Sequence, residues 1–416
     1  MPAPALAWKA LTAAALAATV ALVLFAGRDR EAPVLRVSPL PAGPTGAAAL
    51  VVEGTAEDAH PVQVLVQVGA APPRPAAVGP GGAFRAELPL AGLPDGPVPV
   101  RVEAVDAALQ PNRAVFTGEL LRDGTPPALA LRAPRLSPGV AQALRIEADP
   151  DAVSVELELA GVPFPVRPAP GGGWRALVAV RHDHAGPAAL TLRARDAAGN
   201  AAAAAGVLEV APAAWPEGGK IPLTPAQKAA RKDEAALARA REARGAAAAQ
   251  GGPDPLWSGP FTRPCTGWFS SPFGKYRTYA DGARSHHLGL DIAEVKGAPV
   301  GAAAPGTVTL VDEQPIFGKT VIVVHGQGVA TSYNHLSATS VTPGQAVAAG
   351  ERLGAIGTTG QSTGPHLHWT VSVGGVSVDP AGWLRVDPLG EAALSGGSAG
   401  EPVALTAVEA AAVDGR

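Results

Sequence analysis

An internal repeat constrains the fold of this chain more strongly than any other feature of its sequence. When residues 33–122 are laid over residues 123–212, similar segments follow in the same order. GGAFRAELPL at 81–90 matches GGGWRALVAV at 171–180. Repetition at a fixed period is typical of structural units that recur along a chain. The sequence therefore predicts two tandem modules of about 90 residues each.

Both modules alternate apolar and polar residues with a period of two. VQVLVQV at 62–68 and VSVELEL at 153–159 are examples, and glycine, proline and aspartate interrupt the runs about every ten residues. This pattern predicts short half-buried strands that pack as a β-sandwich. The closing RARDAAGN of the second copy resembles bacterial immunoglobulin-like modules. We expect two such sandwiches, acting as spacers rather than as specific ligand-binding domains.

Composition narrows the range of functions. Fifty glycines, 43 prolines and an aromatic content of 4% favour a mainly β protein with many turns. A formal net charge of −3 argues against nucleic acid as a partner. Cys265 is the only cysteine, so an intrachain disulfide is excluded and a metal site would depend on His, Asp or Glu.

The N-terminal segment, residues 1–32, predicts contact with a membrane. Residues 10–27 carry no charge and end in ALVLFAG. A signal peptidase prefers small residues at −3 and −1, whereas cleavage after Ala26 or Gly27 would leave Leu24 or Phe25 at −3. We therefore favour an uncleaved membrane helix over a cleaved signal segment.

Residues 213–255 predict a helical linker. Thr224 can cap a helix, Pro225 suits its first turn, and one helix of about 20 residues is expected before Gly245. Its basic side chains are interpreted as a solvated face rather than as a site for an anionic partner. The small and polar residues of the tail, 387–416, predict disorder.

Most of the nine histidines fall after residue 285, and they form an ordered pattern with one aspartate. His287 precedes Asp291 by four residues, His335 follows in SYNHLS, and His366 and His368 flank one leucine in GPHLHW. Residues two or four apart on a strand share a face, so each pair should project into one cleft, and Gly289 should leave room between His287 and Asp291. Histidine nitrogens with one carboxylate and no thiolate suit a catalytic zinc ion, which keeps one position open for water.

HLGLD, YNHLS and TGPHLHW, in this order, resemble the motifs of the M23 zinc endopeptidases, the lysostaphin-like or LytM-type family. The likeness covers residues 256–386 and implies a C-terminal all-β peptidase domain. It also implies one zinc ion held by His287, Asp291 and His368. His335 and His366 would act on the zinc-activated water or on the tetrahedral intermediate.

The resemblance implies hydrolysis of peptide cross-links in bacterial peptidoglycan, at Gly-Gly bridges or at bonds between D-alanine and a diamino acid. With the N-terminal segment, it suggests a periplasmic enzyme held at the inner membrane, or a secreted one if that segment is cleaved. Peptidoglycan stems and the membrane would be its partners, and the sandwich modules offer a surface for a protein partner. Two alternatives remain: a non-enzymatic adaptor that regulates another hydrolase, and a surface adhesin.

Overall fold

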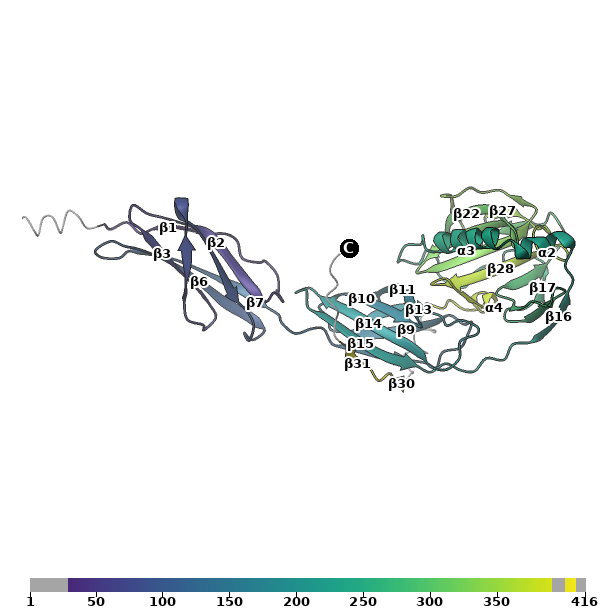
Figure 1. Ribbon diagram of the computed structural model, residues 1–416, viewed down its shortest axis with the longest axis horizontal. Coiled ribbons are helices and arrows are strands. Elements are labelled where there is room, and N and C mark those ends of the chain that lie inside the picture. Colours follow the sequence, from purple (N-terminus) through teal and green to yellow (C-terminus); the bar gives the residue numbers. More distant parts are fainter. Residues whose placement is uncertain (1–28, 391–400, 409–416) are drawn as a thin grey trace, which may run out of the picture. The chain divides into compact units, whose positions relative to one another are not determined.

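The computed structural model describes residues 29–390 and 401–408 (Figure 1). They divide into two compact units. One runs to Pro126 and takes Ala197–Asn200, and the other takes Pro127–Asp196 and the described residues from Ala201 onward. Strands dominate both units, so the expected mainly β fold class is confirmed.

The membrane prediction falls outside this description. Residues 10–27 are not among the described residues. Within 29–390 and 401–408, no helix combines the length and the apolar character needed to cross a bilayer.

The first unit is a seven-stranded antiparallel sheet with the order β1-β2-β5-β4-β3-β6-β7. Alternate side chains of β3 and β6, such as Val64 and Val102, are fully buried, as the period of two predicts. The immunoglobulin-like assignment remains a prediction. The elements are β1 (Val34–Val37), β2 (Ala49–Glu57), β3 (Val62–Val68), β4 (Arg74–Val78), the short 3-10 turn η1 (Pro80–Gly82), β5 (Ala83–Pro89), β6 (Gly96–Asp106) and β7 (Arg113–Arg122).

The second module has two five-stranded sheets, β11-β10-β14-β15-β31 and β12-β13-β9-β8-β30. Leu144 and Ile146 of one sheet and Leu190 and Leu192 of the other belong to a common core. The strands along the chain are β8 (Leu129–Ala133), β9 (Gln142–Ala148), β10 (Ala152–Leu159), β11 (Val162–Phe164), β12 (Val166–Pro168), β13 (Trp174–Val178), β14 (Ala188–Asp196) and β15 (Ala201–Leu208).

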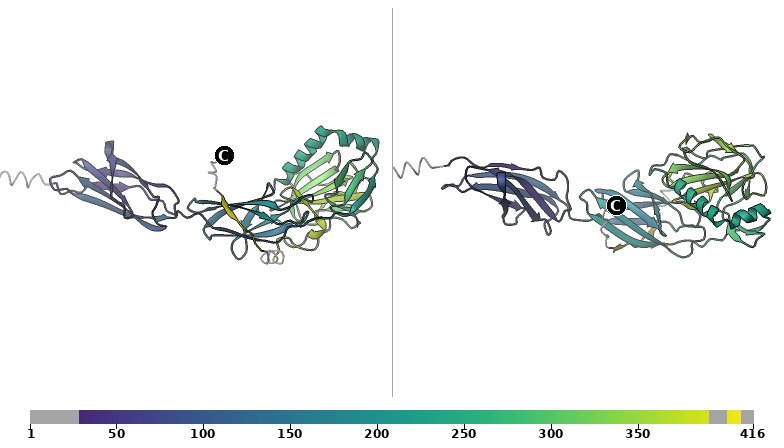
Figure 2. Two further views of the ribbon diagram at one scale, coloured as in Figure 1. Left: turned by 60° about the horizontal axis from the view of Figure 1, so that its bottom comes forward. Right: turned by 45° about the horizontal axis from the view of Figure 1, so that its top comes forward.

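The C-terminal tail supplies one edge strand to each of these two sheets. β30 (Glu401–Pro402) pairs with β8, and β31 (Thr406–Val408), the yellow strand beside the teal sheet in Figure 2, pairs with β15. The sequence predicted disorder here because the tail is small and polar. Backbone pairing with an open sheet edge does not require an apolar pattern, which explains the difference.

The segment predicted as a linker contains one strand and two helices: β16 (Glu217–Ile221), α2 (Pro225–Lys232) and α3 (Glu234–Ala248). Thr224 caps α2 in a capping box with Gln227, as its sequence indicates. Asp233 ends α2, and its side chain accepts a hydrogen bond from the Ala236 amide, which starts α3. The expected single helix is therefore two.

The C-terminal part is built on an eight-stranded sheet in the order β17-β20-β28-β24-β23-β22-β26, with β29 beside β28. Helix α3 packs against β22 and β23, where Ala247 contacts a cluster with Ile322 and Val324 (Figure 1). Two three-stranded sheets, β16-β18-β19 and β21-β27-β25, complete it. The remaining elements are β17 (Trp268–Ser271), β18 (Tyr276–Tyr279), β19 (Arg284–His286), β20 (Leu290–Ala293), β21 (Pro299–Gly301), β22 (Gly306–Gln314), β23 (Gly318–Gly326), β24 (Val329–Leu336), β25 (Ala338–Thr339), β26 (Ala346–Val347), β27 (Arg352–Ala355), β28 (His366–Val373), β29 (Val376–Val378) and α4 (Pro380–Trp383).

Candidate metal centre and cleft

Strand β28 positions the two histidines of the HLH motif. His366 and His368 lie on one face of the strand, while Leu367 between them is fully buried in the core. This alternation is the one that the sequence predicts for a strand. On either side of β28, the residues opposite His368 are Asp291 of β20 and Asn334 of β24.

His287 reaches the same point from an irregular turn. The sequence suggested one continuous strand from His287 to Asp291, but β19 ends at His286 and β20 begins at Leu290. Gly289 in the turn is essential for the close approach. A Cβ atom there would lie 2.6 Å from the Trp369 carbonyl oxygen and 2.8 Å from Cε1 of His368. The expectation that this glycine leaves room is confirmed.

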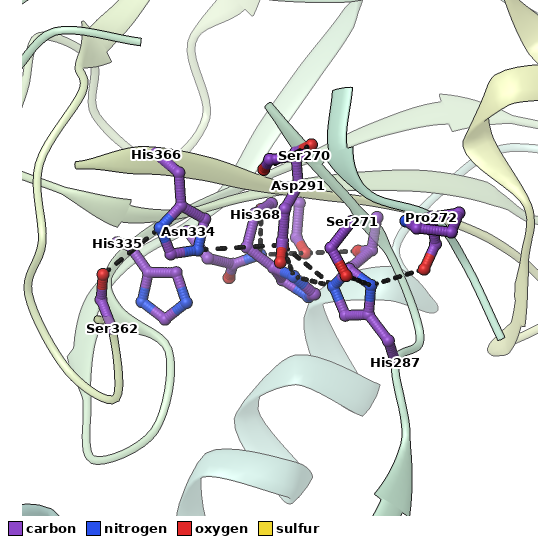
Figure 3. Close-up of polar contacts among 12 residues, drawn as sticks. Ser270, Ser271, Pro272, His287, Asp291, Asn334, His335, Ser362, His366 and His368 are labelled. Carbon is purple, nitrogen blue, oxygen red and sulfur yellow. Dashed lines mark hydrogen bonds and ion pairs between the residues drawn. The ribbon is translucent and has the colours of Figure 1, made fainter. Parts of the chain in front are cut away.

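Three potential ligand atoms converge, from His287, Asp291 and His368 (Figure 3). The distance from His287 Nε2 to Asp291 Oδ1 is 2.9 Å, and from His368 Nδ1 to the same oxygen it is 2.8 Å. The two histidine nitrogens lie 2.9 Å apart. All three residues are buried. Two nitrogens and one carboxylate oxygen, gathered without thiolate, are a donor set that zinc accepts.

Hydrogen bonds around the three residues leave the converging atoms available for an ion. His287 Nδ1 lies 2.8 Å from the Pro272 carbonyl, so the proton belongs on Nδ1 and Nε2 keeps its lone pair. Arg277 donates to Asp291 Oδ2 over 2.6 Å, which leaves Oδ1 facing the histidines. Backbone and side-chain partners of this kind orient metal ligands and fix their tautomers.

Burial and charge set the protonation of the group. Burial opposes ionisation of Asp291, but its close polar contacts with His287 and His368 hold its pKa well below the usual range. Burial lowers the pKa of His368 to about 4, although Asp291 works in the opposite direction. A charged carboxylate beside a neutral His368 imidazole is the protonation state that metal binding requires.

His335 and His366 stand beside this group, with ring centroids 4.9 Å apart. The Nδ1 atoms of both face backbone carbonyls over 2.8 Å, those of Thr359 and Gly364, so each Nε2 is free to accept a proton. His366 Nε2 lies 3.8 Å from Asp291 Oδ1. Burial, together with the charges of His368 and His366, lowers the pKa of His335 to about 3, so it is neutral near pH 7.

A cleft of about 500 Å³ opens onto these histidines. Three cations line it, Lys220 of β16 together with Lys275 and Arg277, and among its described lining residues Asp291 is the single acid. Strand β16 runs parallel to β18 and forms one wall. The walls include Gly218, Gly219, Ile221, Pro222, Ser270, Ser271, Ala293 and residues 361–365.

Two other histidines, His286 and His325, stay out of the group. His325 is fully buried, with Nδ1 2.7 Å from the Pro305 carbonyl. His286 directs Nδ1 to the Gly274 carbonyl, and its ring contacts Tyr276. His287, and not the adjacent His286, contacts Asp291. The four-residue spacing to Asp291 therefore identified the correct histidine of the pair.

Several residues around the site escaped the sequence reasoning, among them Arg277, Asn334 and Lys220. Arg277 lies in the segment FTRPCTGWFSSPFGKYRTY, whose likeness to the family's domain was visible, but nothing in its spacing indicates contact with Asp291. Arg231 and Arg244 belong to the helices predicted to be solvated. Arg231 instead bonds Asp281 and Gln361, and Arg244 bonds Ser332 and Asn334.

Comparison with known proteins identifies the family of the part of the chain that carries this site. Residues 285–380 match the model of Peptidase family M23, so the chain contains a peptidase M23 family domain. The DD-carboxypeptidase/endopeptidase Mpg of Neisseria meningitidis is 43% identical over 112 residues, which are 27% of this chain and 26% of that protein. The peptidoglycan DD-endopeptidase ShyA of Vibrio cholerae is 41% identical over 93 residues, 22% of each protein.

The similarity is confined to one part of these proteins, since the chain spans about a quarter of the length of the curated relatives it matches. Among solved structures, a crystal structure of a peptidase M23 from Pseudomonas aeruginosa is 29% identical. It covers 60% of this chain and 95% of its own, with a TM-score of 0.44.

Proposed function

We propose that this chain is a zinc-dependent endopeptidase that hydrolyses peptide cross-links of bacterial peptidoglycan. The observation that carries the proposal is the convergence of His287 Nε2, His368 Nδ1 and Asp291 Oδ1 beside an open cleft that Asp291 lines. Names of the relatives point to the same substrate, since ShyA is a peptidoglycan DD-endopeptidase.

In this proposal His287, Asp291 and His368 hold one zinc ion. Zinc bound there supplies a Lewis acid that polarises a carbonyl and lowers the pKa of water. His335 and His366 present unprotonated Nε2 atoms beside it, so one can take the proton of the attacking water. That same histidine, now protonated, can return the proton to the leaving amine, while the other can hold the water or the tetrahedral intermediate in position.

The charge of the cleft favours one kind of cross-link. A Gly-Gly bridge carries no side-chain charge, whereas a diamino diacid carries a free carboxylate beside the scissile amide. Lys220, Lys275 and Arg277 face the cleft, and Asp291 is committed to the metal. Cations lining a cleft raise the local concentration of an anionic substrate. We therefore favour the bond between D-alanine and a carboxylate-bearing diamino acid.

Attachment to the inner membrane belongs to the proposal as well, resting on the uncharged residues 10–27. It would leave the peptidase on the periplasmic side, where its substrate lies. The immunoglobulin-like modules would then act as spacers that could carry a protein partner.

The test is hydrolysis by the purified whole chain. It is incubated with isolated peptidoglycan and zinc, and the products are identified by mass spectrometry, with a chelator and a His335→Ala variant as controls. We expect cross-linked peptides to be split only by the zinc-loaded wild type. Failure to release any peptide, with retained binding to peptidoglycan, would instead support the non-enzymatic adaptor.

A further inference from the structure

Helix α3 brings one arginine to the side of the sheet that carries the histidines. The guanidinium of Arg244 donates to Ser332 Oγ over 2.8 Å, to Asn334 Oδ1 over 3.1 Å and to Gln314 Oε1 over 3.3 Å. Its Cζ atom also lies 4.0 Å from the ring centroid of Phe317. Burial lowers the pKa of Arg244 to about 10, so the side chain still carries its charge near pH 7.

The first route from Arg244 to the site passes through Asn334. This asparagine is fully buried, and its Nδ2 donates to the His368 carbonyl over 2.8 Å. Its Oδ1 accepts from Arg244 and from Thr320 Oγ1, at 3.1 Å each. Two donors on the oxygen fix the orientation of the amide, and this orientation keeps its NH₂ group on the backbone of the metal-facing His368.

The second route passes through Phe317. The ring beneath the guanidinium belongs to the residue whose carbonyl accepts the His335 N–H over 2.8 Å. His335 has a φ of 63°, a left-handed conformation that residues other than glycine adopt only when their surroundings hold them. Phe317 also lies against the metal site, with its ring centroid 6.0 Å from that of His368.

We propose that Arg244 is a positioning residue for the metal centre. It touches neither the converging atoms nor the cleft lining, and it acts by holding Asn334 against His368 and Phe317 against His335. The inference rests on the proposed function only in so far as His368 binds zinc. It also means that α3 contributes to the metal centre, although Arg244 precedes the residues that match the family, 285–380.

Geometry as well as charge makes arginine the suitable residue here. A planar guanidinium can donate to several acceptors at once while its face lies on an aromatic ring. A lysine ammonium would keep the charge but could not reach the same acceptors while stacking on Phe317. Removing the side chain leaves the buried Asn334 Oδ1 with one donor fewer and frees the amide to reorient.

The experiment compares Arg244→Gln and Arg244→Lys with the wild type in the whole chain. Arg241→Gln is the matched control, because Arg241 lies one turn earlier on α3 with 71% of its side chain exposed. Zinc affinity is measured by competition with a chelator, kcat and KM are measured on a soluble cross-linked peptide, and thermal unfolding shows which variants are folded. Outer partners of metal ligands typically change affinity or activity by about 10–100-fold.

We expect both Arg244 variants to lose about 10-fold or more in zinc affinity and in kcat, with KM within about twofold of the wild type. Arg241→Gln should match the wild type in all of these. Wild-type zinc affinity in a folded Arg244→Gln protein would overturn the inference. So would equal losses in Arg241→Gln, or full rescue by lysine. If the wild type binds zinc but hydrolyses nothing, the proposed function fails, while the zinc-affinity ratios still decide the role of Arg244.

Discussion

The floor of the cleft and its frame are held together in different ways. By floor we mean the five residues His287, Asp291, His335, His366 and His368, four of them on the neighbouring strands β20, β24 and β28. By frame we mean residues 217–279, which supply β16, α2, α3, β17 and β18. The floor strands are aligned by backbone ladders. The arginines of the frame act through side-chain bonds instead, Arg277 to Asp291 itself and Arg244 to Asn334 beside His368.

This difference predicts different effects of substitution in the floor and in the frame. Ladder pairing places Asp291 directly opposite His368, so a change in the floor disturbs the converging atoms themselves. A frame side chain reaches those atoms only through a hydrogen bond to a ligand or to its neighbour. Floor substitutions should therefore abolish activity, and frame substitutions should reduce it by measurable factors.

The largest effect is expected for Gly289→Ala, between the floor residues His287 and Asp291. The new Cβ would lie 2.8 Å from Cε1 of His368 and 2.6 Å from a carbonyl oxygen, closer than real Cβ contacts allow. Zinc affinity and kcat should both fall by about 100-fold or more, since the ligand itself must move. Gly382→Ala, where nothing lies within 4 Å, is the control. Wild-type activity in Gly289→Ala would show that the floor tolerates movement.

Acid should weaken the sheet beneath the floor through His325. Burial lowers its pKa to about 4 from an ordinary value of 6.5. Because the folded-state pKa is depressed, the contribution to stability is complete above pH 6.5 and disappears as the pH falls toward 4. A pKa difference of about 2.5 between the unfolded and folded states corresponds to ~3 kcal/mol of unfolding free energy. The free energy of unfolding is measured with denaturant at pH 7 and at pH 4. Between these pH values it should fall by this much more in the wild type than in His325→Gln, and equal falls in the two proteins would refute the prediction.

Arg277→Gln tests the frame where it meets the floor most directly. The substitution removes the 2.6 Å bond to Asp291 Oδ2 and the 3.2 Å bond to Ser271 Oγ. We expect zinc affinity to fall by about 10-fold, the lower end for an outer partner. Arg284→Gln is the matched control, since Arg284 lies on the neighbouring strand β19 with 51% of its side chain exposed. The comparison fails if both variants bind zinc equally well.

The smallest effect is expected for Lys220→Gln on the outer wall. An exposed charge on a rim contributes about 1 kcal/mol or less, so KM should rise by about three-fold for a cross-link with free carboxylates. An amidated cross-link should show no change, and Lys228→Gln on α2 serves as the control. If KM rises equally for both substrates, carboxylate recognition by this wall is wrong.

The floor could be anticipated because its residues are rare and their spacing is informative. His366 and His368 flank an apolar residue, and the burial of Leu367 follows from the strand period alone. The side chain of His287 contacts that of Asp291 although no continuous strand joins the two residues. The turn at Gly289 brings the two residues together. The sequence predicted that this glycine leaves space between them, but it did not predict the turn.

The frame could not be anticipated in the same way. α2 and α3 carry several arginines and lysines in similar surroundings along the chain, and only tertiary contact distinguishes Arg244 from Arg241. The break at Asp233 depends on one side-chain bond to a backbone amide. Strands β30 and β31 depend on edges that other segments leave open, information that no local pattern contains.

The division of labour between His366 and His368 offers the most direct test of this account. Zinc affinity by chelator competition and turnover of a cross-linked peptide are measured for the wild type, His366→Ala and His368→Ala. Neither variant should turn over substrate, but only His368→Ala should lose zinc affinity, by more than the 10–100-fold typical of outer partners. Equal loss of zinc from both variants, or a wild type that binds no zinc, would contradict the central claim.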